Sequence, residues 1–334
     1  MKAWEMQPGK AGLTQSDRPE PQLGFGQVLI KMRAASLNSR DLLLIKGADS
    51  FQPQSPLIPL SDGVGEIVAV GEGVTRVKAG DRVASIFMQK WLEGQLSPEK
   101  AQSVLGGAYD GVLAEYVTLH EDGVVRVPDH LSDEEAATLP CSAVTAWHAL
   151  IAEGKIKPGE TVLVLGTGGV SLFALQFAKL MGARVIATSS SDAKLERVRQ
   201  WGASDGINYQ TTPNWGDRIK ELTNGIGVDH IVEFGGAGTL NQSLHAVRMG
   251  VSISLIGVLS GTSGEITTAS ILLNQIRVQG IYVGSREMFE AMNRAIALHQ
   301  LKPIVDRVFP FAEVPEALAY LESGKHFGKI AIRV

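Results

Sequence analysis

The sequence predicts an α/β protein in which a doubly wound parallel sheet follows a β-rich, irregular N-terminal part. From Thr161 onward, apolar strand-like runs alternate with helical patterns, and the runs lie near 162–165, 185–188, 230–233, 252–256 and 277–283. Such alternation is typical of parallel strands joined by right-handed helical crossovers. Before residue 125, strand signals at 27–34, 65–70 and 113–118 are separated by turns that contain proline or glycine.

Helix signals complete this order of elements. Ser97 and Pro98 carry the pattern of a helix start, a capping hydroxyl followed by proline in the first turn. Ser132-Asp133-Glu134-Glu135 is a capping box that opens a helix toward Leu139. The last predicted elements are a helix at 286–299, a strand at 304–309, a helix at 312–323 ended by Gly324, and a strand at 329–334.

A glycine turn within residues 161–191 is the most informative motif. The apolar run Val162–Leu165 meets Gly166-Thr167-Gly168-Gly169, and a helical pattern and a second strand follow. Glycine lets the backbone approach a pyrophosphate, and the helix N-terminus offers free N–H groups, so the unit indicates a dinucleotide site. Ser171 replaces the third glycine of the usual pattern, and an ordinary glycine turn is the alternative interpretation.

Composition and charge narrow the class of protein. The 334 residues, 44% of them hydrophobic, suffice for two cores. The net charge of −4 gives no support for binding to nucleic acid or an acidic membrane. No apolar run approaches the roughly 20 residues that span a bilayer, and the N-terminus lacks a signal-peptide core. The single cysteine, Cys141, fits a reducing cytoplasm. We therefore expect a soluble, cytoplasmic enzyme with a small-molecule substrate.

Several segments together resemble the medium-chain dehydrogenase/reductase superfamily over nearly the whole chain. They are SLNSRDLLLIKG (36–47), PLSDGVGEIVAVGEGVTRVKAGDRV (59–83), AATLPCSAVTAWHAL (136–150), the GTGGV turn and HFGKIAI (326–332). The resemblance implies a GroES-like catalytic domain at 1–125, completed by 300–334, and a Rossmann NAD(P)-binding domain at 126–299. It places the cofactor in the cleft between the two. It also implies a homodimer, since the last Rossmann strand, here near 277–283, often pairs with a second copy.

The resemblance raises the question of zinc. Zinc-dependent members hold a catalytic zinc through Cys, His and Cys, and the matching positions here are Asn38, Ser61 and Cys141. Asn and Ser are poor zinc ligands, and one thiolate cannot make the usual site of three protein ligands. Asp62 stands where the family often has Glu beside the zinc, and residues 88–110 lack the cysteines of the structural-zinc lobe. The sequence therefore predicts no zinc and a resemblance to the quinone-oxidoreductase-like branch.

The expected cofactor is NADP(H) in preference to NAD(H). An NAD site usually has an acidic residue about twenty residues after the glycine turn, to bind the ribose 2′-OH. The matching position is Ser189, followed by Ser190, and Lys194 can supply a cation for a 2′-phosphate. Asp192 argues against this assignment, because a carboxylate would repel a 2′-phosphate, unless its side chain caps the helix that begins at Ala193. Tyr209 matches a tyrosine of the adenosine pocket in NADPH-dependent quinone reductases. Further residues expected to line the cofactor are Asn38, Thr145, Thr167, Gly168, Gly169, Val170, Gly257, Val258, Val283 and Gly284.

The resemblance also suggests the catalytic residues. Hydride transfer to a carbonyl or a conjugated alkene places negative charge on the substrate oxygen, which a donor must stabilise. Asn38 is the first candidate because its amide can donate to that oxygen, and Ser61 and Asp62 are expected to line the pocket. Arg40 and Asp41 are expected to fix the loop through an ion pair.

The sequence thus predicts an NADPH-dependent, zinc-free reductase of quinones or small α,β-unsaturated carbonyls. One alternative is an alcohol or aldehyde dehydrogenase without zinc, assisted by Asn38, Ser61 and Asp62. Another is a non-catalytic, NADPH-binding redox sensor. The segment 46–50 lacks the tyrosine that enoyl-thioester reductases of the superfamily use, which argues against acyl-thioester reduction. Loops 48–58 and 88–110 are expected to shape the substrate pocket.

Overall fold

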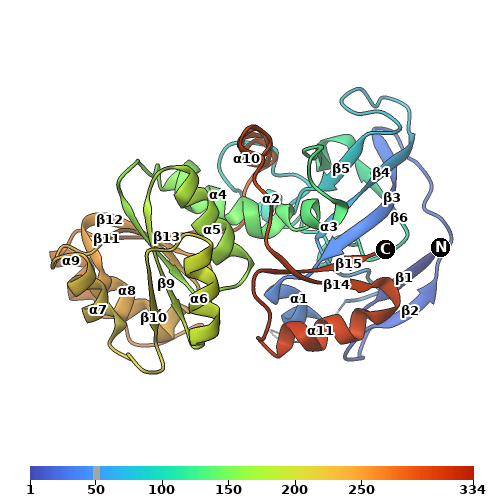
Figure 1. Cartoon of the computed structure of the whole chain (residues 1–334). Helices are drawn as coiled ribbons and strands as arrows, with labels where there is room; N and C mark the ends of the chain where they lie inside the picture. Colours follow the sequence, from blue (N-terminus) through green and yellow to red (C-terminus); the bar gives the residue numbers. More distant parts are fainter. Residues whose placement is uncertain (48–52) are drawn as a thin grey trace. The chain divides into compact units, whose positions relative to one another are not determined.

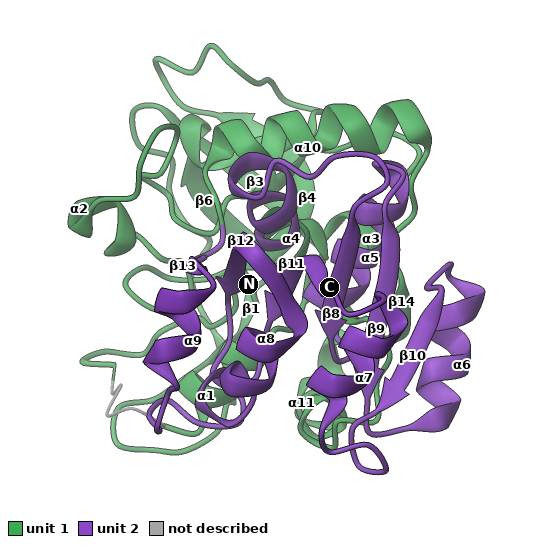
Figure 2. Ribbon diagram, turned by 90° about the vertical axis from the view of Figure 1, so that its left-hand side faces the viewer, with its two compact units in different colours: residues 1–144, 284–334 green, residues 145–283 purple. Residues whose placement is uncertain are grey.

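The computed structural model describes residues 1–47 and 53–334 (Figure 1). These residues form two compact units, coloured separately in Figure 2. Unit 1 consists of Met1–Val144 and Gly284–Val334, and unit 2 consists of Thr145–Val283. Residues 48–52, which belong to one expected substrate loop and to the segment without tyrosine, lie outside the described residues.

The borders of the units differ from those expected at 125/126 and 299/300. β7 (Val124–Arg126) continues the sheet of unit 1, and α3 (Asp133–Ala136) packs against strands of that sheet. α10 (Arg286–His299) contacts β7 in the same unit. Residues 126–144 and 284–299 therefore belong to unit 1, because their tertiary contacts, which local sequence signals do not report, are with its sheet.

A seven-stranded sheet forms the centre of unit 1, in the order β14-β15-β3-β4-β5-β7, and β6 pairs with β3. β14 and β15 run parallel, and the other neighbours run antiparallel. Val28, Ile30 and Met32 alternate toward the core along β3, as the two-residue period of a strand requires. The bounds are β3 (Gln27–Ser36), β4 (Asp62–Val70), β5 (Arg82–Ser85), β6 (Tyr116–His120), β14 (Val305–Pro310) and β15 (Lys329–Arg333); β1 (Lys2–Glu5) and β2 (Thr14–Asp17) form a separate pair.

The register of this sheet brings three strand ends together. Ser36, the last residue of β3, pairs with Asp62, the first residue of β4. On its other side Ser36 pairs with Ala331 of β15. The chain therefore leaves β3 beside the beginnings of both neighbouring strands, and Asn38 follows directly as the N-cap of α1 (Ser39–Ile45).

The helices of unit 1 match the expected starts better than the expected lengths. The Ser97 side chain caps α2 (Pro98–Ala101), and Ser132 with Glu135 forms the predicted capping box of α3. The helix expected to continue toward Leu139 ends at Ala136, however. A π-helix over Leu139–Ala143 follows, and α4 (Val144–Trp147), which crosses the border into unit 2, comes next. α11 (Val314–Glu322) ends just before Gly324, whose φ of +63° suits glycine.

Unit 2 contains the predicted parallel sheet, in the order β10-β9-β8-β11-β12-β13. This is the doubly wound order in which ligands bind beyond the carboxyl ends of the central strands. The strands are β8 (Thr161–Leu165), β9 (Arg184–Ser189), β10 (Asp205–Asn208), β11 (Val228–Glu233), β12 (Val247–Leu255) and β13 (Arg277–Gly280). The helices are α5 (Gly169–Leu180), α6 (Asp192–Gln200), α7 (Trp215–Leu222), α8 (Leu240–Ala246) and α9 (Thr268–Leu273). Within the described ranges, no helix combines the length and apolar character of a membrane crossing.

Candidate active site

Several segments of unit 1 bring polar side chains together in its interior. Asn38 caps α1, Ser61 and Asp62 lie at the beginning of β4, and Ser142 belongs to the π-helix. Lys329 is the first residue of β15. We call these five residues the polar cluster. Asn38 is 7% exposed, Lys329 3% and Asp62 0%, so the cluster contains a buried cation and a buried carboxylate.

The ammonium group of Lys329 lies at the centre of the polar cluster. Its Nζ donates to the Leu37 carbonyl and to Asn38 Oδ1, each at 2.6 Å. The same atom lies 4.0 Å from Asp62 Oδ2. Burial lowers the pKa of Lys329, whereas the negative charge of Asp62 opposes that change. The buried cation is therefore compensated by two short hydrogen bonds and one ion pair, as a desolvated charge requires.

Asp62 ties β4 to the π-helix. It accepts hydrogen bonds from Ser61 Oγ at 2.7 Å and from the Cys141 backbone N–H at 3.1 Å. Burial raises the pKa of Asp62, and the charge of Lys329 acts in the opposite direction. π-helical turns are frequent at functional sites, and here the turn presents both a backbone donor and the Ser142 hydroxyl to the cluster.

The Asn38 amide has a defined orientation with a donor left over. Its Oδ1 accepts from Lys329 Nζ and, at 3.1 Å, from Ser142 Oγ. Its Nδ2 is buried and has no hydrogen-bond partner of acceptable geometry within residues 1–47 and 53–334, although the side chain is close enough to Asp62 to favour the ionised carboxylate. A buried donor without an acceptor is uncommon in proteins, and a catalytic or ligand-binding role is one explanation for such a group.

Asp41 holds the backbone of Asn38 from the helix side. Asp41 Oδ2 accepts from the Asn38 N–H at 2.8 Å, and the predicted ion pair with Arg40 is confirmed at 3.2 Å. Burial raises the pKa of Asp41 to about 6, while the Arg40 guanidinium acts to lower it. Arg40 in turn lies over the Phe87 ring, 4.9 Å from its centroid.

Leu60 precedes the cluster in a strained backbone conformation. Its φ is +66°, a left-handed value that is unusual for a residue with a branched side chain. The backbone of Gly111 packs so closely on Leu60 that a Cβ there would lie 2.0 Å from the Leu60 carbonyl oxygen. This tight loop fixes the direction in which the chain enters Ser61 and Asp62.

In unit 2, the glycine turn joins β8 to α5 as predicted. Gly166 has a φ of +78°, and Gly168 is the N-cap of α5. A Cβ at Gly168 would meet no atom of the described residues within 4 Å, which leaves its backbone open to a ligand. Ser171 Oγ donates to the Leu165 carbonyl at 2.7 Å. Ser171, which stands in place of the third glycine, thus links the first turn of α5 to the end of β8. Thr167, Gly169 and Val170 complete the same turn.

The residues expected at the adenosine end lie on adjacent strands. Ser189 ends β9 and pairs with Asn208 of β10, and the Tyr209 N–H donates to the Ser189 carbonyl at 3.1 Å. Ser190 follows Ser189 directly. α6 is capped by Ser191, whose Oγ accepts from the Lys194 N–H, and not by Asp192 as the sequence suggested.

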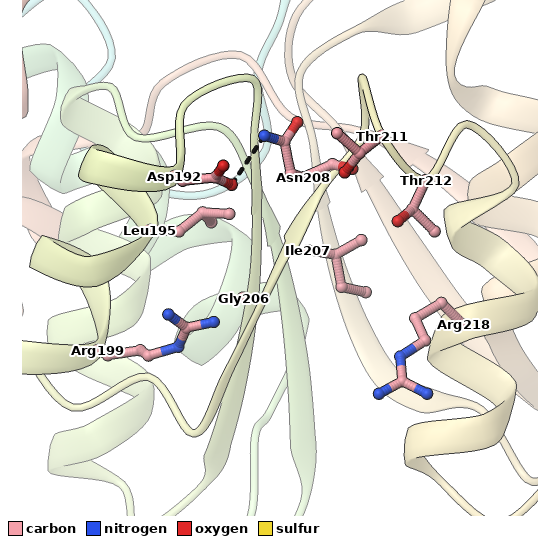
Figure 3. A pocket seen from close by; sticks show the side chains of 9 residues that line it. All are labelled: Asp192, Leu195, Arg199, Gly206, Ile207, Asn208, Thr211, Thr212 and Arg218. Atoms are coloured by element: carbon pink, nitrogen blue, oxygen red, sulfur yellow. Dashed lines mark hydrogen bonds between the residues drawn. The ribbon is translucent and has the colours of Figure 1, made fainter.

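Asp192 borders a neighbouring pocket on β10, shown in Figure 3. Its Oδ1 accepts from Asn208 Nδ2 at 2.8 Å, and Ile207 lies in the base of the pocket. Asp192 thus lies beside Asn208, the residue that pairs with Ser189, near the expected 2′-phosphate position.

The other residues expected to line the cofactor lie in different segments of the two units. Gly257 and Val258 follow β12, and Thr145 is buried at the start of unit 2. Val283 ends unit 2 with a φ of +56°, and its carbonyl accepts from His148 Nδ1 at 2.7 Å. Gly284 belongs to unit 1, as do Asn38, Ser61 and Asp62.

Zinc does not suit the polar cluster. Asn38 and Ser61 offer neutral oxygen atoms, and burial followed by the charge of Asp62 raises the pKa of the Cys141 thiol, which opposes the thiolate that zinc requires. The Lys329 ammonium group already donates a hydrogen bond to the amide oxygen of Asn38. Within the described parts of the chain, no group of three or more His, Cys, Asp and Glu side chains could hold a metal ion.

Sequence reasoning missed Lys329 and Ser142 as members of the cluster. Lys329 lies in the segment Lys-Ile-Ala-Ile-Arg, where a lysine at the start of a strand usually reaches solvent. One signal could have found it. The same segment carries the family resemblance, and the three residues after Lys329 are all apolar. Such a run indicates a buried strand, and in the structure Ile330, Ala331 and Ile332 are indeed buried, which leaves Lys329 with little access to water.

Comparison with known proteins defines the class. The model of the alcohol dehydrogenase GroES-like domain matches residues 24–129, and that of the zinc-binding dehydrogenase domain matches residues 169–297. A zinc-type alcohol dehydrogenase-like protein of Schizosaccharomyces pombe is 44% identical over 319 residues, which are 94% of this chain and 92% of that protein. The chain belongs to the medium-chain dehydrogenase/reductase superfamily of oxidoreductases.

Solved structures agree with this assignment. The structure of an NAD-dependent alcohol dehydrogenase is 33% identical, with a TM-score of 0.90 and full coverage of both chains. A mycobacterial quinone oxidoreductase is 28% identical, with a TM-score of 0.82 and the same full coverage. The chain is thus similar both to alcohol dehydrogenases and to quinone reductases of the superfamily.

Proposed function

We propose that the protein is an NADPH-dependent, zinc-free oxidoreductase that reduces quinones or small α,β-unsaturated carbonyls. The observation that carries this proposal is the Asn38 amide: a buried NH₂ group that makes no hydrogen bond of acceptable geometry within the described residues, with Asp62 nearby and a buried cation on its oxygen. Such a donor can stabilise the oxygen on which negative charge develops as a carbonyl or enone is reduced. Similarity to a quinone oxidoreductase supports the substrate class.

The residues of unit 2 support a bound dinucleotide. The open backbone at Gly168 and the N-terminus of α5 suit a pyrophosphate, and Ser189 offers a hydroxyl where NAD sites usually have a carboxylate. Bound NADPH supplies the hydride. Ser189, Ser190 and Lys194 would hold its 2′-phosphate, and Tyr209 would line the adenosine. The structure of an NAD-dependent relative and the carboxylate of Asp192 are the observations that favour NADH instead.

Fluorescence titration with NADPH and NADH tests the cofactor proposal. We expect NADPH to bind at least about tenfold more tightly, since charge-assisted hydrogen bonds to a phosphate contribute about 1.5–3 kcal/mol. Ser189→Asp combined with Lys194→Ala should erase or reverse this preference. Equal or tighter binding of NADH to the unchanged protein would contradict the NADPH assignment.

Gly168→Ala tests where the pyrophosphate lies. A Cβ at this position would lie within 4 Å of no atom of the described residues. The change should therefore cost at most about 1 kcal/mol of stability, because alanine is a less favourable N-cap residue than glycine. It should nevertheless weaken NADPH binding at least about tenfold, because the methyl group would fill the space left for the ligand. Gly280→Ala is the matched control, since its Cβ also meets no described atom. Unchanged binding by Gly168→Ala would place the cofactor elsewhere.

Steady-state assays separate the proposed activity from its main alternative. NADPH oxidation with quinones or enones supports the proposal, and zinc content measured by mass spectrometry of the active protein should be far below one ion per chain. The alternative is alcohol or aldehyde dehydrogenation assisted by Asn38, Ser61 and Asp62, which the names of the 44% and 33% identical relatives favour. NADP⁺ reduction by alcohols without quinone or enone turnover would establish that alternative. Tight NADPH binding without any turnover would indicate a redox sensor.

We also propose that a second copy of the chain pairs with β13. Within the described residues β13 is the outer strand of its sheet, and the nearby side chains of Leu272 and Leu273 are 77% and 72% exposed. An open strand edge beside exposed apolar side chains is a typical self-association surface. Sedimentation equilibrium should give a dimer, and Leu272→Asp with Leu273→Asp should give a monomer. A monomeric unchanged protein would refute this.

A further inference from the structure

We propose that Lys329 is a positioning residue for the reduction: its ammonium group holds the Asn38 amide in one orientation and strengthens the Asn38 NH₂ group as a donor to the substrate oxygen. This role rests on the proposed function, in which Asn38 donates to that oxygen. Lys329 and Asn38 are 291 residues apart in the sequence, and their contact exists only because β15 lies beside β3 in the sheet.

The partners of the amide oxygen determine its orientation. An ammonium group carries three donors and no acceptor, so the atom of the Asn38 amide that faces Lys329 must be the oxygen. Ser142 Oγ donates to the same oxygen at 3.1 Å. A flipped amide would set its NH₂ group against the ammonium and lose the hydrogen bond from Lys329. The NH₂ group therefore points away from Lys329; Asp62 is nearby, but no described residue accepts a hydrogen bond of acceptable geometry from it.

The charge of Lys329 also changes the donor strength of the amide. A carboxamide whose oxygen accepts a charge-assisted hydrogen bond becomes more polarised, and its N–H groups then bind an acceptor more strongly. The bond from Lys329 Nζ is 2.6 Å long and lies in a buried region, where electrostatic effects are larger than in water. The gain is greatest when the acceptor becomes negative, as the substrate oxygen does during hydride transfer.

The surroundings keep Lys329 in place. The Leu37 carbonyl accepts a second short hydrogen bond, and Asp62 supplies a compensating charge at 4.0 Å. Asp62 is itself held by Ser61 and by the backbone of Cys141. The lysine is thus a cation held in a fixed position. Of the two groups that accept its hydrogen bonds, the Asn38 amide is the one that also carries N–H donors.

A double-mutant cycle tests whether Lys329 acts through Asn38. The assay is kcat and KM for NADPH oxidation with a quinone and with an enone, for Lys329→Met, Asn38→Ala and the double variant. We expect Lys329→Met to lower kcat about tenfold to a hundredfold, less than the roughly hundredfold to thousandfold loss when a transition-state donor itself is removed, with KM for NADPH unchanged. The double variant should be no slower than Asn38→Ala alone, and Lys329→Arg should recover most of the loss. Independent, multiplying effects would overturn the proposal.

A second measurement needs no substrate and therefore separates this proposal from the proposed function. In protein labelled with ¹⁵N-asparagine, Asn38→Ala identifies the side-chain amide resonances of Asn38. Lys329→Met should move them, whereas Lys325→Met, an exposed lysine in the segment before β15, should leave them in place. Unmoved Asn38 resonances in Lys329→Met would overturn the proposal even in an active enzyme. If Lys329→Met does not fold, Lys329→Gln keeps a donor without the charge and replaces it in both experiments.

Discussion

Removal of the Asp41 charge should stabilise the protein at neutral pH and not in acid. Asp41 is 1% exposed, and its pKa rises from 3.8 to about 6 on folding, because burial disfavours the ionised form more than Arg40 favours it. Between these two values the native state binds more protons than the unfolded state, so the contribution of Asp41 to stability falls as the pH rises. The rise of roughly two pKa units corresponds to about 3 kcal/mol.

Asp41→Asn keeps an acceptor for the Asn38 N–H and cannot ionise. The free energy of unfolding of the variant, relative to the unchanged protein, should increase by up to about 3 kcal/mol from about pH 4 to about pH 7.5. Below about pH 4 Asp41 is protonated in both states and forms no ion pair with Arg40, so the variant should have little or no advantage in acid. Urea unfolding at several pH values measures this, with the exposed Asp17→Asn as control. A difference that does not change with pH would refute the reasoning.

Three further substitutions test the packing of polar groups in unit 2. Glu233→Gln should cost about 2–4 kcal/mol in thermal unfolding, because the buried carboxylate accepts from the Gly235 and Gly236 N–H groups and from the Thr239 and Ser243 hydroxyls, and an amide can serve only part of this set. Ser171→Ala should cost about 1 kcal/mol, since it leaves the Leu165 carbonyl without its side-chain donor. Burial lowers the pKa of His148, so its contribution to stability is present above the unfolded value of 6.5 and is lost as the pH falls from 6.5 through the lower pKa of the folded protein. His148→Asn, which can still donate to the Val283 carbonyl, should remove that acid sensitivity in urea titrations.

Local signals were sufficient for most of the parallel sheet. The strands of unit 2 around β8 carry apolar runs bounded by turns, and the glycine turn lies at the start of α5 as expected. β10 shows the limit of such signals. Its sequence is Asp-Gly-Ile-Asn, and only Ile207 is buried, so its strand conformation depends on pairing with β9.

The candidate site was harder to predict than the fold. Asn38, Ser61 and Asp62 could be named because the family resemblance covers their segments. Lys329 also lies in a segment that carries the resemblance, but its role could not be named, because its hydrogen bonds join the last strand to residues near the beginning of the chain. The π-helix that presents Ser142 has no established sequence pattern, and the unit borders depend on packing rather than on composition.

The place of β15 in the sheet has a consequence for synthesis of the protein. β3 and β4 are made early, yet β15, which lies between β14 and β3, is translated after the whole of unit 2. Until Lys329 emerges, the nascent chain holds Asp62 without its cation and Asn38 without the partner that orients it. Unit 2, by contrast, is one continuous segment and can fold during translation. Newly made chains should therefore complete the parallel sheet and its glycine turn before the polar cluster of unit 1 is assembled.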